Sequence, residues 1–348
     1  MTPTYDIAVV GATGLVGSVI LEILEERKFP VNKIYPLASE KSAGTNLRFG
    51  GHSAIVHDVA DFDFSKVQIA FFSAGGKVSE KYVPKAAAAG CISIDNTSHF
   101  RYDEDVPLII PEVNPEAILQ YYKRKIIANP NCSTIQMLVA LKPIYDAVGI
   151  SRIDVATYQA VSGAGRSAVD ELARETTELM NAQNAVPKVF PAQIAFNVIP
   201  QVDVILENGY TKEEMKMVWE THKILNDSSI VVNPTAVRVP VFFGHSEAVH
   251  IETKKSITPE NALKLLRKAP GVKVIKPEKG YPMAFTHGAN SDFVFVGRVR
   301  QNPSHPQHLN LWVVADNIRK GAALNAIQIA ENLIENNFYL DEIDELAR

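Results

Sequence analysis

The first 130 residues alternate between short apolar runs and amphipathic segments. Apolar residues recur at three- and four-residue spacing in segments such as 78–89, which predicts helices. The short runs are rich in β-branched residues and predict buried strands at 6–10, 33–38, 67–72, 91–94, 107–110 and 125–128. Strands that alternate with helices predict an α/β fold with a doubly wound, mostly parallel sheet. Such sheets bind ligands beyond the carboxyl ends of their strands.

The pattern changes after about residue 150. Strand-like segments occur at 153–161, 231–243, 247–253, 293–300 and 309–315, and helical patterns occur at 167–183, 211–225, 258–268 and 317–336. Because several strands follow one another without a regular helical crossover, we expect a second, α+β domain with a mixed sheet and helices on one face. The other face of that sheet then stays free, which favours a homo-oligomer.

Composition narrows the class of protein. The chain has 348 residues, which is enough for two domains. A formal net charge of −4 gives no basis for binding nucleic acid or an anionic membrane surface. The two cysteines, Cys91 and Cys132, are too few for a disulfide scaffold and fit a reducing compartment. No signal-peptide pattern opens the chain and no apolar run approaches the about 18 residues of a membrane span, so we expect a cytoplasmic protein.

A glycine-rich turn, Gly11-Ala-Thr-Gly-Leu-Val-Gly17, follows the first predicted strand and opens a helical segment. Strand, glycine turn and helix are the context in which a dinucleotide-binding fingerprint acts. The glycines let the backbone approach a pyrophosphate, which then binds at the N-terminus of the helix. We expect a Rossmann-like nucleotide site here. The alternative is a tight turn between strand and helix that binds nothing.

The end of the second predicted strand bears on the choice of coenzyme. Folds that prefer NAD place an acidic residue there, on the ribose 2′-hydroxyl. Ser39, Lys41 and Ser42 instead offer hydrogen bonds and one positive charge, which suit a 2′-phosphate and predict NADP. Glu40 leaves NAD open as the coenzyme, because its carboxylate can face the ribose.

Cys132 lies where a predicted strand stops and an amphipathic stretch over roughly 133–148 begins. A thiol at the start of a helix is stabilised as the thiolate by the helix dipole and becomes a nucleophile. The alternative is a buried cysteine with a packing role. Three strand-end loops, at 73–76, 95–98 and 129–132, should converge on one crevice, which favours the catalytic interpretation.

Two arginines and a histidine are candidate site residues. Arg238 and His245 are separated by a segment with Gly244, which allows a bend that brings the two side chains together. An arginine holds a carboxylate bidentately, and a histidine moves protons near neutral pH. Arg101 follows the loop at 95–98, where a planar guanidinium can bind phosphate. A solvated charge or a structural histidine is the alternative for each.

Other polar residues lie near predicted element ends. Gln159 lies near the end of its strand and offers a neutral amide to a thiol or a substrate carbonyl. The turn with Ser162 and Gly163 is a second glycine-rich segment at which the backbone can approach a cofactor. The alternative is an ordinary strand-to-helix turn. Glu213 and Lys216 lie three residues apart on one helix face, where the alternative is an exposed ion pair worth tenths of a kcal/mol.

Several of these segments, in this order, resemble the aspartate-β-semialdehyde dehydrogenase family. The matching segments are Gly11–Gly17, Asp95-Asn-Thr-Ser98 with Arg101, Asn129-Pro-Asn-Cys-Ser-Thr134, Tyr158-Gln-Ala-Val-Ser-Gly-Ala-Gly165, Lys212-Glu-Glu-Met-Lys216, Arg238-Val-Pro-Val241, Gly244-His-Ser-Glu247 and Ala315-Asp-Asn-Ile318. The resemblance runs from about residue 6 to about residue 335. Its specificity comes from the ordered set, since no single segment is decisive.

The resemblance implies a reaction on the route to lysine, threonine and methionine. L-Aspartyl-4-phosphate, NADPH and a proton are interconverted with aspartate semialdehyde, NADP and phosphate. Carried over by motif, Cys132 resembles the nucleophile that forms an acyl-thioester. His245 resembles the general acid/base, and Gln159 the residue that positions substrate and thiol. Backbone N–H groups at the start of the Cys132 helix are expected to stabilise the oxyanion.

The same resemblance implies the ligand contacts. Arg238 and Glu213 would bind the carboxylate and amine of the substrate, and Arg101 and Lys216 its phosphate. Cofactor contacts are implied at Thr13, Gly14, Leu15, Val16, Ser39, Glu40, Lys41, Ser42, Ser162, Gly163 and Asn317. No metal is expected.

The resulting expectation is an NADP-binding Rossmann-like domain over 1–130, completed by a C-terminal helix at 317–348. Residues 131–316 would form the catalytic and dimerisation domain of a homodimer or a dimer of dimers. Two alternatives stay open. One is a related acyl-phosphate reductase, such as one for N-acetylglutamyl phosphate. The other is a non-catalytic NADP-binding protein.

Overall fold

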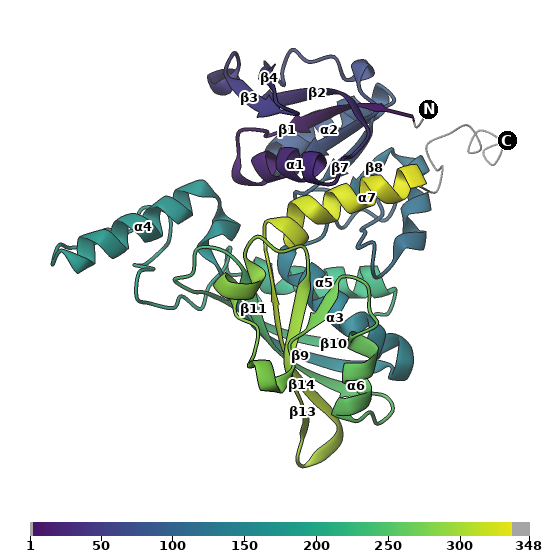
Figure 1. Ribbon diagram of the computed structural model, residues 1–348, viewed down its shortest axis with the longest axis vertical. Coiled ribbons are helices and arrows are strands. Elements are labelled where there is room, and N and C mark those ends of the chain that lie inside the picture. Colours follow the sequence, from purple (N-terminus) through teal and green to yellow (C-terminus); the bar gives the residue numbers. More distant parts are fainter. Residues whose placement is uncertain (1–2, 336–348) are drawn as a thin grey trace. The chain divides into compact units, whose positions relative to one another are not determined.

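The structure is a computed structural model that describes residues 3–335. The chain divides into two compact units, coloured by sequence in Figure 1. Unit 1 comprises the residues up to Pro130 together with those from Ala322 onward, and unit 2 comprises Asn131–Gly321. Each unit has its own six-stranded sheet.

The sheet of unit 1 is parallel throughout, as the sequence predicts. Its strands are β1 (Tyr5–Val10), β2 (Val31–Ala38), β5 (His57–Asp58), β6 (Ile69–Phe72), β7 (Ile92–Asp95) and β8 (Ile126–Ala128). They follow the order β5-β2-β1-β6-β7-β8, and every pair is parallel. Strand β1 is therefore central: β2, the next strand in sequence, pairs on one side of it, and β6 pairs on the other side. Ligands of doubly wound sheets bind at the carboxyl ends of two such strands.

Helices bury apolar faces against this sheet. They are α1 (Leu15–Glu26), α2 (Gly76–Ala88) and α7 (Leu324–Glu335). Helix α1 buries Ile20, Ile23 and Leu24 at helical spacing, in one core with residues of β1, β6 and α7. An ion pair of 2.6 Å between Arg27 Nε and Glu331 Oε1 also joins α1 to α7, so the last described helix belongs to unit 1 although it is distant in sequence.

Two expectations about unit 1 are wrong. Segment 107–110 forms no regular strand; only an isolated bridge joins Leu108 to Ala128. The last helix begins at Leu324 rather than at 317, after a π-helical turn at Arg319–Ala323, and residues 317–321 lie in unit 2. The remainder of the expected helix, 336–348, lies outside the described residues.

The sequence interpretation also missed an antiparallel hairpin in unit 1. Strands β3 (Asn46–Phe49) and β4 (His52–Ile55) are joined by Gly50 and Gly51, which have φ of +58° and +78°. A two-residue turn with both residues at positive φ is the favoured hairpin connection, and glycine adopts that conformation without strain. The Gly-Gly pair was the available signal.

The sheet of unit 2 is mixed, as predicted. Its strands are β9 (Ile150–Gln159), β10 (Val231–Arg238), β11 (His245–Thr253), β12 (Val272–Val274), β13 (Val294–Asn302) and β14 (His305–Ala315). They follow the order β10-β9-β11-β14-β13-β12. The two outermost pairs are parallel and the three inner pairs are antiparallel. Strand β10 ends at Arg238 rather than at 243, and β11 begins at His245 after Gly244, which has φ of +86°.

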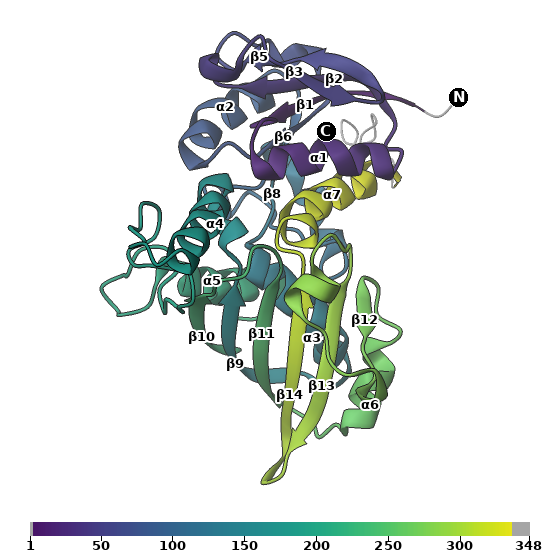
Figure 2. The same ribbon diagram turned by 60° about the vertical axis from the view of Figure 1, so that its left-hand side comes forward.

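Helices cover one face of this mixed sheet, and Figure 2 shows α3 behind the strands. They are α3 (Cys132–Val148), α5 (Lys212–Leu225) and α6 (Pro259–Leu266), while α4 (Arg166–Met180) packs on a small separate core with Ile194 and Ile199. Strand β9 shows the expected alternation. Thr157 and Gln159 are buried, whereas Tyr158 between them is 38% exposed.

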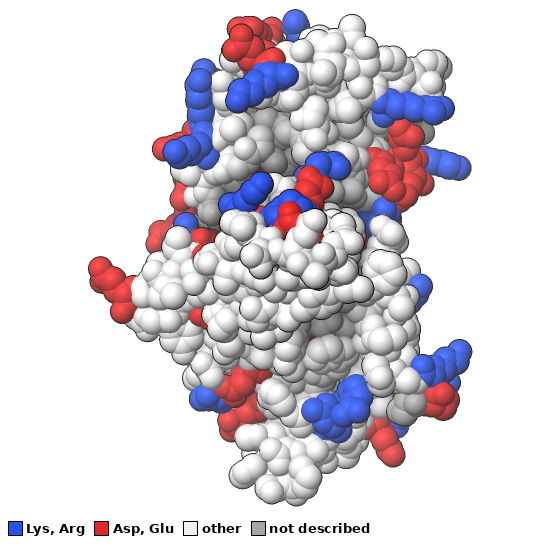
Figure 3. All heavy atoms as spheres, turned by 90° about the vertical axis from the view of Figure 1, so that its left-hand side faces the viewer, with Lys and Arg blue, Asp and Glu red and all other residues white. Residues whose placement is uncertain are grey.

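The opposite face of the mixed sheet carries both apolar and polar side chains, among them the ion pair of Arg152 with Asp154. A groove there is lined by residues that include Tyr281, Met283, Phe285 and Trp312, and the ring centroids of Tyr158 and Trp312 lie 5.6 Å apart. The space-filling view of Figure 3 shows a broad surface of unit 2 with few charged side chains. Among the described residues, no helix combines the length and apolar character needed to cross a membrane.

Candidate active site

Three candidate side chains form a row across one edge of the mixed sheet. Arg238 and Gln159 are the last residues of β10 and β9 and are direct partners in the parallel pair. His245 is the first residue of antiparallel β11, and Ser246 pairs with Tyr158, so the register places His245 beside Gln159. All three are at least 94% buried. Residues distant in sequence therefore meet because three strands begin or end at one level.

Cys132 is the first residue of α3 and is half-buried, unlike the fully buried Cys91. The predicted position at a helix start is confirmed. Asn131 caps the helix, because its Oδ1 accepts hydrogen bonds from the N–H groups of Ser133 and Thr134. This capping corrects one expectation. The two N–H groups that the cap engages are not available to an oxyanion, although the helix dipole still favours the thiolate.

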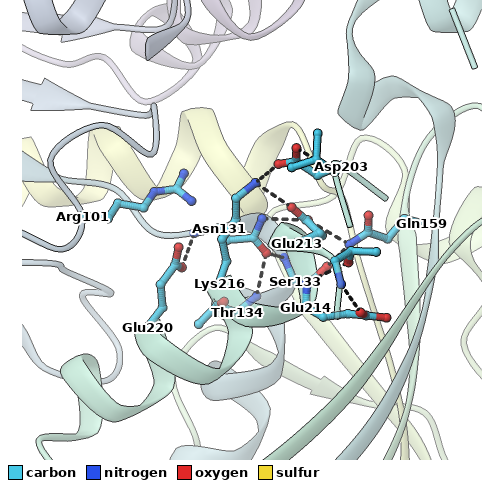
Figure 4. Close-up of polar contacts among 12 residues, drawn as sticks. Arg101, Asn131, Ser133, Thr134, Gln159, Asp203, Glu213, Glu214, Lys216 and Glu220 are labelled. Carbon is cyan, nitrogen blue, oxygen red and sulfur yellow. Dashed lines mark hydrogen bonds and ion pairs between the residues drawn. The ribbon is translucent and has the colours of Figure 1, made fainter. Parts of the chain in front are cut away.

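Gln159 connects the start of α3 to α5, as Figure 4 shows. Its Nε2 donates to Ser133 Oγ at 2.6 Å and to Glu213 Oε1 at 3.1 Å. Glu213 Oε1 also accepts from Asn131 Nδ2 at 2.8 Å. The amide that the sequence assigned to positioning is therefore held by both helices that surround Cys132.

The pair of Glu213 and Lys216 is buried, so the alternative of an exposed ion pair is wrong. Lys216 Nζ lies 2.9 Å from Glu213 Oε2 and 2.9 Å from Asp203 Oδ2. Burial opposes ionisation of Glu213, but Lys216 and the amides of Asn131 and Gln159 outweigh it and lower the pKa of this carboxyl to about 2. Asp203, which the sequence interpretation missed, lies in a loop with φ of +70°.

His245 accepts a hydrogen bond on one ring nitrogen. The backbone N–H of Ala160 donates to its Nδ1 at 3.0 Å, and because that N–H can only donate, the neutral ring carries its proton on Nε2. Burial and the nearby charge of Arg238 lower the pKa of His245 to about 3. Among the described residues, Nε2 has no hydrogen-bond partner. The ring is thus a neutral donor at neutral pH.

Arg238 is fixed by its surroundings. Its Nη1 donates to the Ala160 carbonyl at 2.7 Å, and its guanidinium lies 5.8 Å from the ring centroid of Phe190. Burial lowers its pKa, whereas interactions with Glu213 and Cys132 raise it. The electrostatic interaction with Cys132 places a cation near the thiol, which favours the thiolate.

The turn after β9 approaches both Arg238 and His245. A Cβ atom on Gly163 would lie 3.1 Å from Arg238 Nη1 and 3.5 Å from His245 Cε1 and Nε2. The neighbouring Ser162 donates from its Oγ to Asn317 Oδ1, and Asn317 Oδ1 also accepts from the N–H of Gly244. These three expected cofactor contacts therefore meet at the row, and Asn317 fixes the bend before His245.

Arg101 belongs to unit 1. Its Nε donates to the Asn129 carbonyl at 2.8 Å and its Nη2 to the Asn96 carbonyl at 2.9 Å. The guanidinium therefore ties together the loops that follow β7 and β8. Its expected contact with phosphate stays a prediction.

The glycine turn of unit 1 has the geometry expected of an anion-binding loop. Gly11 has φ of +88°, and a Cβ on Gly17 would lie 2.1 Å from the Gly11 carbonyl oxygen. The N-cap of α1 is Gly14, which has no side chain, and no acidic residue lies in the first helical turn. Thr13 and Gly14 are exposed and Leu15 and Val16 are half-buried. This helix N-terminus fits the pyrophosphate of a dinucleotide.

The predicted adenine-ribose loop follows β2 in the same unit. Ser39 precedes the short 3-10 turn Glu40–Ser42, and Ser39, Glu40 and Lys41 are exposed while Ser42 is half-buried. The only other cysteine of the chain, Cys91, is fully buried, and burial raises the pKa of its thiol to about 12. In the part of the chain that the structure describes, no group of three or more His, Cys, Asp or Glu residues is arranged to hold a metal ion.

Two family models match the chain. The model described as semialdehyde dehydrogenase, NAD binding domain, matches residues 6–121. The model described as semialdehyde dehydrogenase, dimerisation domain, matches residues 141–320.

Individual relatives match over almost the whole chain. The aspartate-semialdehyde dehydrogenase of Shewanella sp. strain DB6705 is 61% identical over 97% of this chain and 100% of its own length. That of Legionella pneumophila is 58% identical over 98% of each chain. Among solved structures, aspartate semialdehyde dehydrogenase II of Vibrio cholerae complexed with ASA has a TM-score of 0.95 at 57% identity, covering 96% of this chain and 99% of that one.

Proposed function

Because the chain belongs to the aspartate-semialdehyde dehydrogenase family, we propose that it reduces L-aspartyl-4-phosphate to L-aspartate 4-semialdehyde with NADPH, through an acyl-thioester on Cys132. The chain is an oxidoreductase of that family. One observation carries the proposed mechanism. The half-buried thiol at the start of α3 is near the buried row of Arg238, Gln159 and His245.

Cys132 makes the covalent bond in this proposal. Its thiolate attacks the acyl carbon, the C–S bond forms, and the C–O bond to phosphate breaks with its electron pair on the departing phosphate. Ionisation of the thiol relies on the helix dipole and on the Arg238 charge, since the Nε2 of resting His245 already carries a proton. Bound NADPH supplies the hydride that reduces the thioester. The C–S bond then breaks and Cys132 leaves as the thiolate again.

His245 stabilises the oxyanion in the proposed resting arrangement. Its Nε2–H has no partner among the described residues and is free to donate to the carbonyl oxygen as negative charge develops. The acid/base role that the family implies needs a second proton on Nδ1, where the Ala160 N–H now donates. Proton transfer by His245 therefore requires this contact to open.

The remaining polar groups are proposed to bind substrate. Arg238 would hold the carboxylate and Glu213 the free amine, as the family pattern implies. Glu213 already accepts three hydrogen bonds, and a carboxylate accepts about four, so one position remains for an ammonium group. Lys216 engages two of its three donors and keeps one for phosphate, a role it would share with Arg101.

The proposed coenzyme is NADP, held by the Gly11–Gly17 turn and by the polar loop after β2. Lys41, Ser39 and Ser42 offer the positive charge and hydrogen bonds that a 2′-phosphate needs. Comparing kcat/KM with NADP and with NAD tests this choice, and a preference for NAD would contradict it.

We further propose a cytoplasmic homodimer that acts on the route to lysine, threonine and methionine. The match to a dimerisation domain and the groove on the outer face of the mixed sheet, lined by Tyr281, Met283, Phe285 and Trp312, support self-association. The mass measured by light scattering tests it. A monomer at micromolar concentration would contradict the dimer, whereas a tetramer would indicate a dimer of dimers.

The decisive assay follows absorbance at 340 nm with aspartate semialdehyde, phosphate and NADP. Cys132→Ser should lower kcat by at least about 10³-fold, because loss of a covalent nucleophile is among the largest effects known in enzymes. Cys91→Ser is the matched control and should stay active, because Cys91 is buried in unit 1. Turnover by the Cys132→Ser variant near that of the wild type would overturn the thioester mechanism. Turnover only with N-acetylated substrate would indicate the related reductase instead.

A further inference from the structure

The loop that follows α4 in Figure 1 has no regular structure of its own. Residues 183–198 form no helix or strand, although Ile194 and Ala195 within them are fully buried. Loops of this length are uncommon in compact domains and are usually functional or disordered. Because buried N–H groups need partners, such a loop must find them outside itself.

Glu171 of α4 supplies the partners for one part of this loop. Its Oε2 accepts hydrogen bonds from the N–H groups of Lys188 and Val189, both at 2.7 Å, and its Oε1 accepts from the N–H of Phe190 at 3.0 Å. Burial raises the pKa of Glu171, but these three N–H groups and the nearby Arg174 outweigh it and hold that pKa below its ordinary value. Glu171 is therefore an anion at neutral pH, and its charge strengthens all three hydrogen bonds.

Glu175 supplies the partners for the following part of the loop. Its Oε2 accepts hydrogen bonds from the N–H groups of Ile194 and Ala195, at 2.9 and 3.0 Å, and the residue is fully buried. Residues four apart lie on one face of a helix, so Glu171 and Glu175 face the loop together. Two side chains of α4 thus hold the backbone of the loop between 188 and 195.

The loop held in this way contacts Arg238 at two points. The ring centroid of Phe190 lies 5.8 Å from the Arg238 guanidinium, a distance at which a cation is attracted to an aromatic ring. Ile199, just beyond Ala195, exchanges two backbone hydrogen bonds with Arg238, of 2.9 and 2.8 Å. The loop therefore borders both the guanidinium and the backbone of the residue that is proposed to bind the substrate carboxylate.

We propose that Glu171 and Glu175 are positioning residues for Arg238, because the loop that they hold sets where its guanidinium meets the substrate carboxylate. This inference rests on the proposed function, in which Arg238 binds that carboxylate. An arginine binds a carboxylate bidentately only when its planar group presents two N–H donors in the correct direction. The Ala160 carbonyl fixes Nη1, and the Phe190 ring lies against the guanidinium. Release of the loop should therefore weaken substrate binding more than it slows the reaction.

Four variants test this role. Glu171→Gln keeps the size of the side chain, but its single amide oxygen accepts at most two hydrogen bonds and carries no charge. Asp170→Asn is the matched control, because Asp170 is the neighbouring acidic residue of α4 and is exposed. Phe190→Leu removes the aromatic ring and keeps an apolar contact, whereas Phe190→Tyr keeps the ring.

Steady-state kinetics should show a change in binding. Glu171→Gln should raise KM for aspartate semialdehyde by about 5- to 20-fold and keep kcat within about 3-fold, as expected when ground-state and transition-state binding weaken together. Phe190→Leu should raise this KM by about 2- to 5-fold, the range of an exposed cation–π contact. Phe190→Tyr and Asp170→Asn should match the wild type. A KM that is unchanged in both Glu171→Gln and Phe190→Leu would overturn the proposal.

A substrate without the carboxylate separates positioning from general damage to the fold. 3-Aminopropanal keeps the amine and the aldehyde of aspartate semialdehyde but gives Arg238 no carboxylate to bind. We expect its kcat/KM to change by less than about 2-fold in Glu171→Gln. Equal losses of kcat/KM with both aldehydes would overturn the proposal. Should 3-aminopropanal react too slowly, or Glu171→Gln fail to fold, the Phe190 variants decide, since equal KM values for Phe190→Leu and Phe190→Tyr also overturn it.

Hydrogen exchange measures the loop itself and needs no substrate. Peptides that span 186–199 should exchange at least about 10-fold faster in Glu171→Gln than in the wild type, because N–H groups that lose a partner open to water more often. Asp170→Asn should exchange at the wild-type rate. Exchange that is not accelerated in Glu171→Gln would overturn the proposal, since Glu171 would then not hold the loop. A wild type without semialdehyde activity rejects the proposed function instead.

Discussion

Two helix N-termini in this chain use the same electrostatics in opposite ways. Helix α1 begins after Gly14, which has no side chain to occupy the N–H groups of the first turn. Helix α3 begins after Asn131, whose side chain binds two of those groups. The N-terminus of α1 has no side-chain cap, so its N–H groups suit an anionic group of a ligand. The N-terminus of α3 is capped by a side chain, and its dipole favours the thiolate form of Cys132 in the same helix. The difference lies in one cap residue.

Removing the α3 cap should have the largest effect. Asn131→Ala loses both the cap and the hydrogen bond to Glu213, so the helix start and Gln159 shift together. We expect kcat to fall by about 10²-fold and stability by about 1 to 2 kcal/mol. Asn131→Asp is the matched variant, because it keeps the cap but adds a negative charge near the thiol, and should mainly raise the pKa of Cys132 in alkylation profiles. Equal alkylation profiles for the wild type and Asn131→Asp would show that charge at the cap residue does not affect the pKa of Cys132.

A side-chain cap at position 14 should give the N-terminus of α1 the capped form that α3 has. Gly14 has φ of −79° and its Cβ would lie 3.2 Å from the Gly11 carbonyl oxygen, so an aspartate fits with a small adjustment. Gly14→Asp should raise KM for NADP by about 10- to 30-fold with little change in kcat at saturation, because the carboxylate caps the helix and repels the pyrophosphate. Gly14→Ser is the neutral control with a smaller effect. No change in KM for either variant would remove this turn from the coenzyme site.

The row at the α3 end also predicts a pH dependence of stability. The folded-state pKa of His245 is about 3, below its ordinary value of 6.5, so the unfolded chain binds more protons between these values. The contribution of neutral His245 is therefore present above pH 6.5 and is lost as pH falls toward 3. His245→Asn should weaken this loss by up to about 1.4 kcal/mol per pH unit. Denaturant unfolding of both proteins at pH 6.5 and pH 5 measures it, and parallel losses would place the ring in contact with water.

The smallest expected effect concerns the charge around Lys216. Asp203→Asn keeps a residue that tolerates positive φ but removes one of two carboxylates from the ammonium group. The site becomes less negative, so KM for phosphate should fall by about 2- to 5-fold. Asp227→Asn, on a part of unit 2 unrelated to Lys216, is the charge-matched control. A rise in KM for phosphate would instead indicate that Asp203 holds Lys216 in place.

The sequence predicts the parts of the fold that depend on local pattern. Strand and helix alternation gave the parallel sheet, and the stop in the apolar run before Cys132 gave the start of α3 within one residue. Segment 107–110 looks like a strand because it is apolar and buried, yet it pairs only at Leu108. Hydrophobicity reports burial, whereas a strand also needs a neighbour with matching register.

Long-range contacts explain what the sequence did not reveal at the site. Glu213 and Lys216 read as an exposed pair because helical spacing says nothing of the loop with Asp203 that lies against them. The cap on α3 was visible as Asn131, but its second bond to Glu213, 82 positions away, was not.

Because Gly163 has no side chain, a substitution there would affect two neighbouring site residues to different degrees. An added methyl group there would press on the Arg238 guanidinium at 3.1 Å but would only touch the His245 ring at 3.5 Å. Under the roles proposed for Arg238 and His245, this one backbone position would therefore affect binding of the substrate carboxylate more than binding of the carbonyl oxygen. Gly163→Ala is therefore a conservative first substitution for changing which acids the enzyme accepts, because under the proposed roles it would disturb the Arg238 contact and leave the His245 contact nearly unchanged.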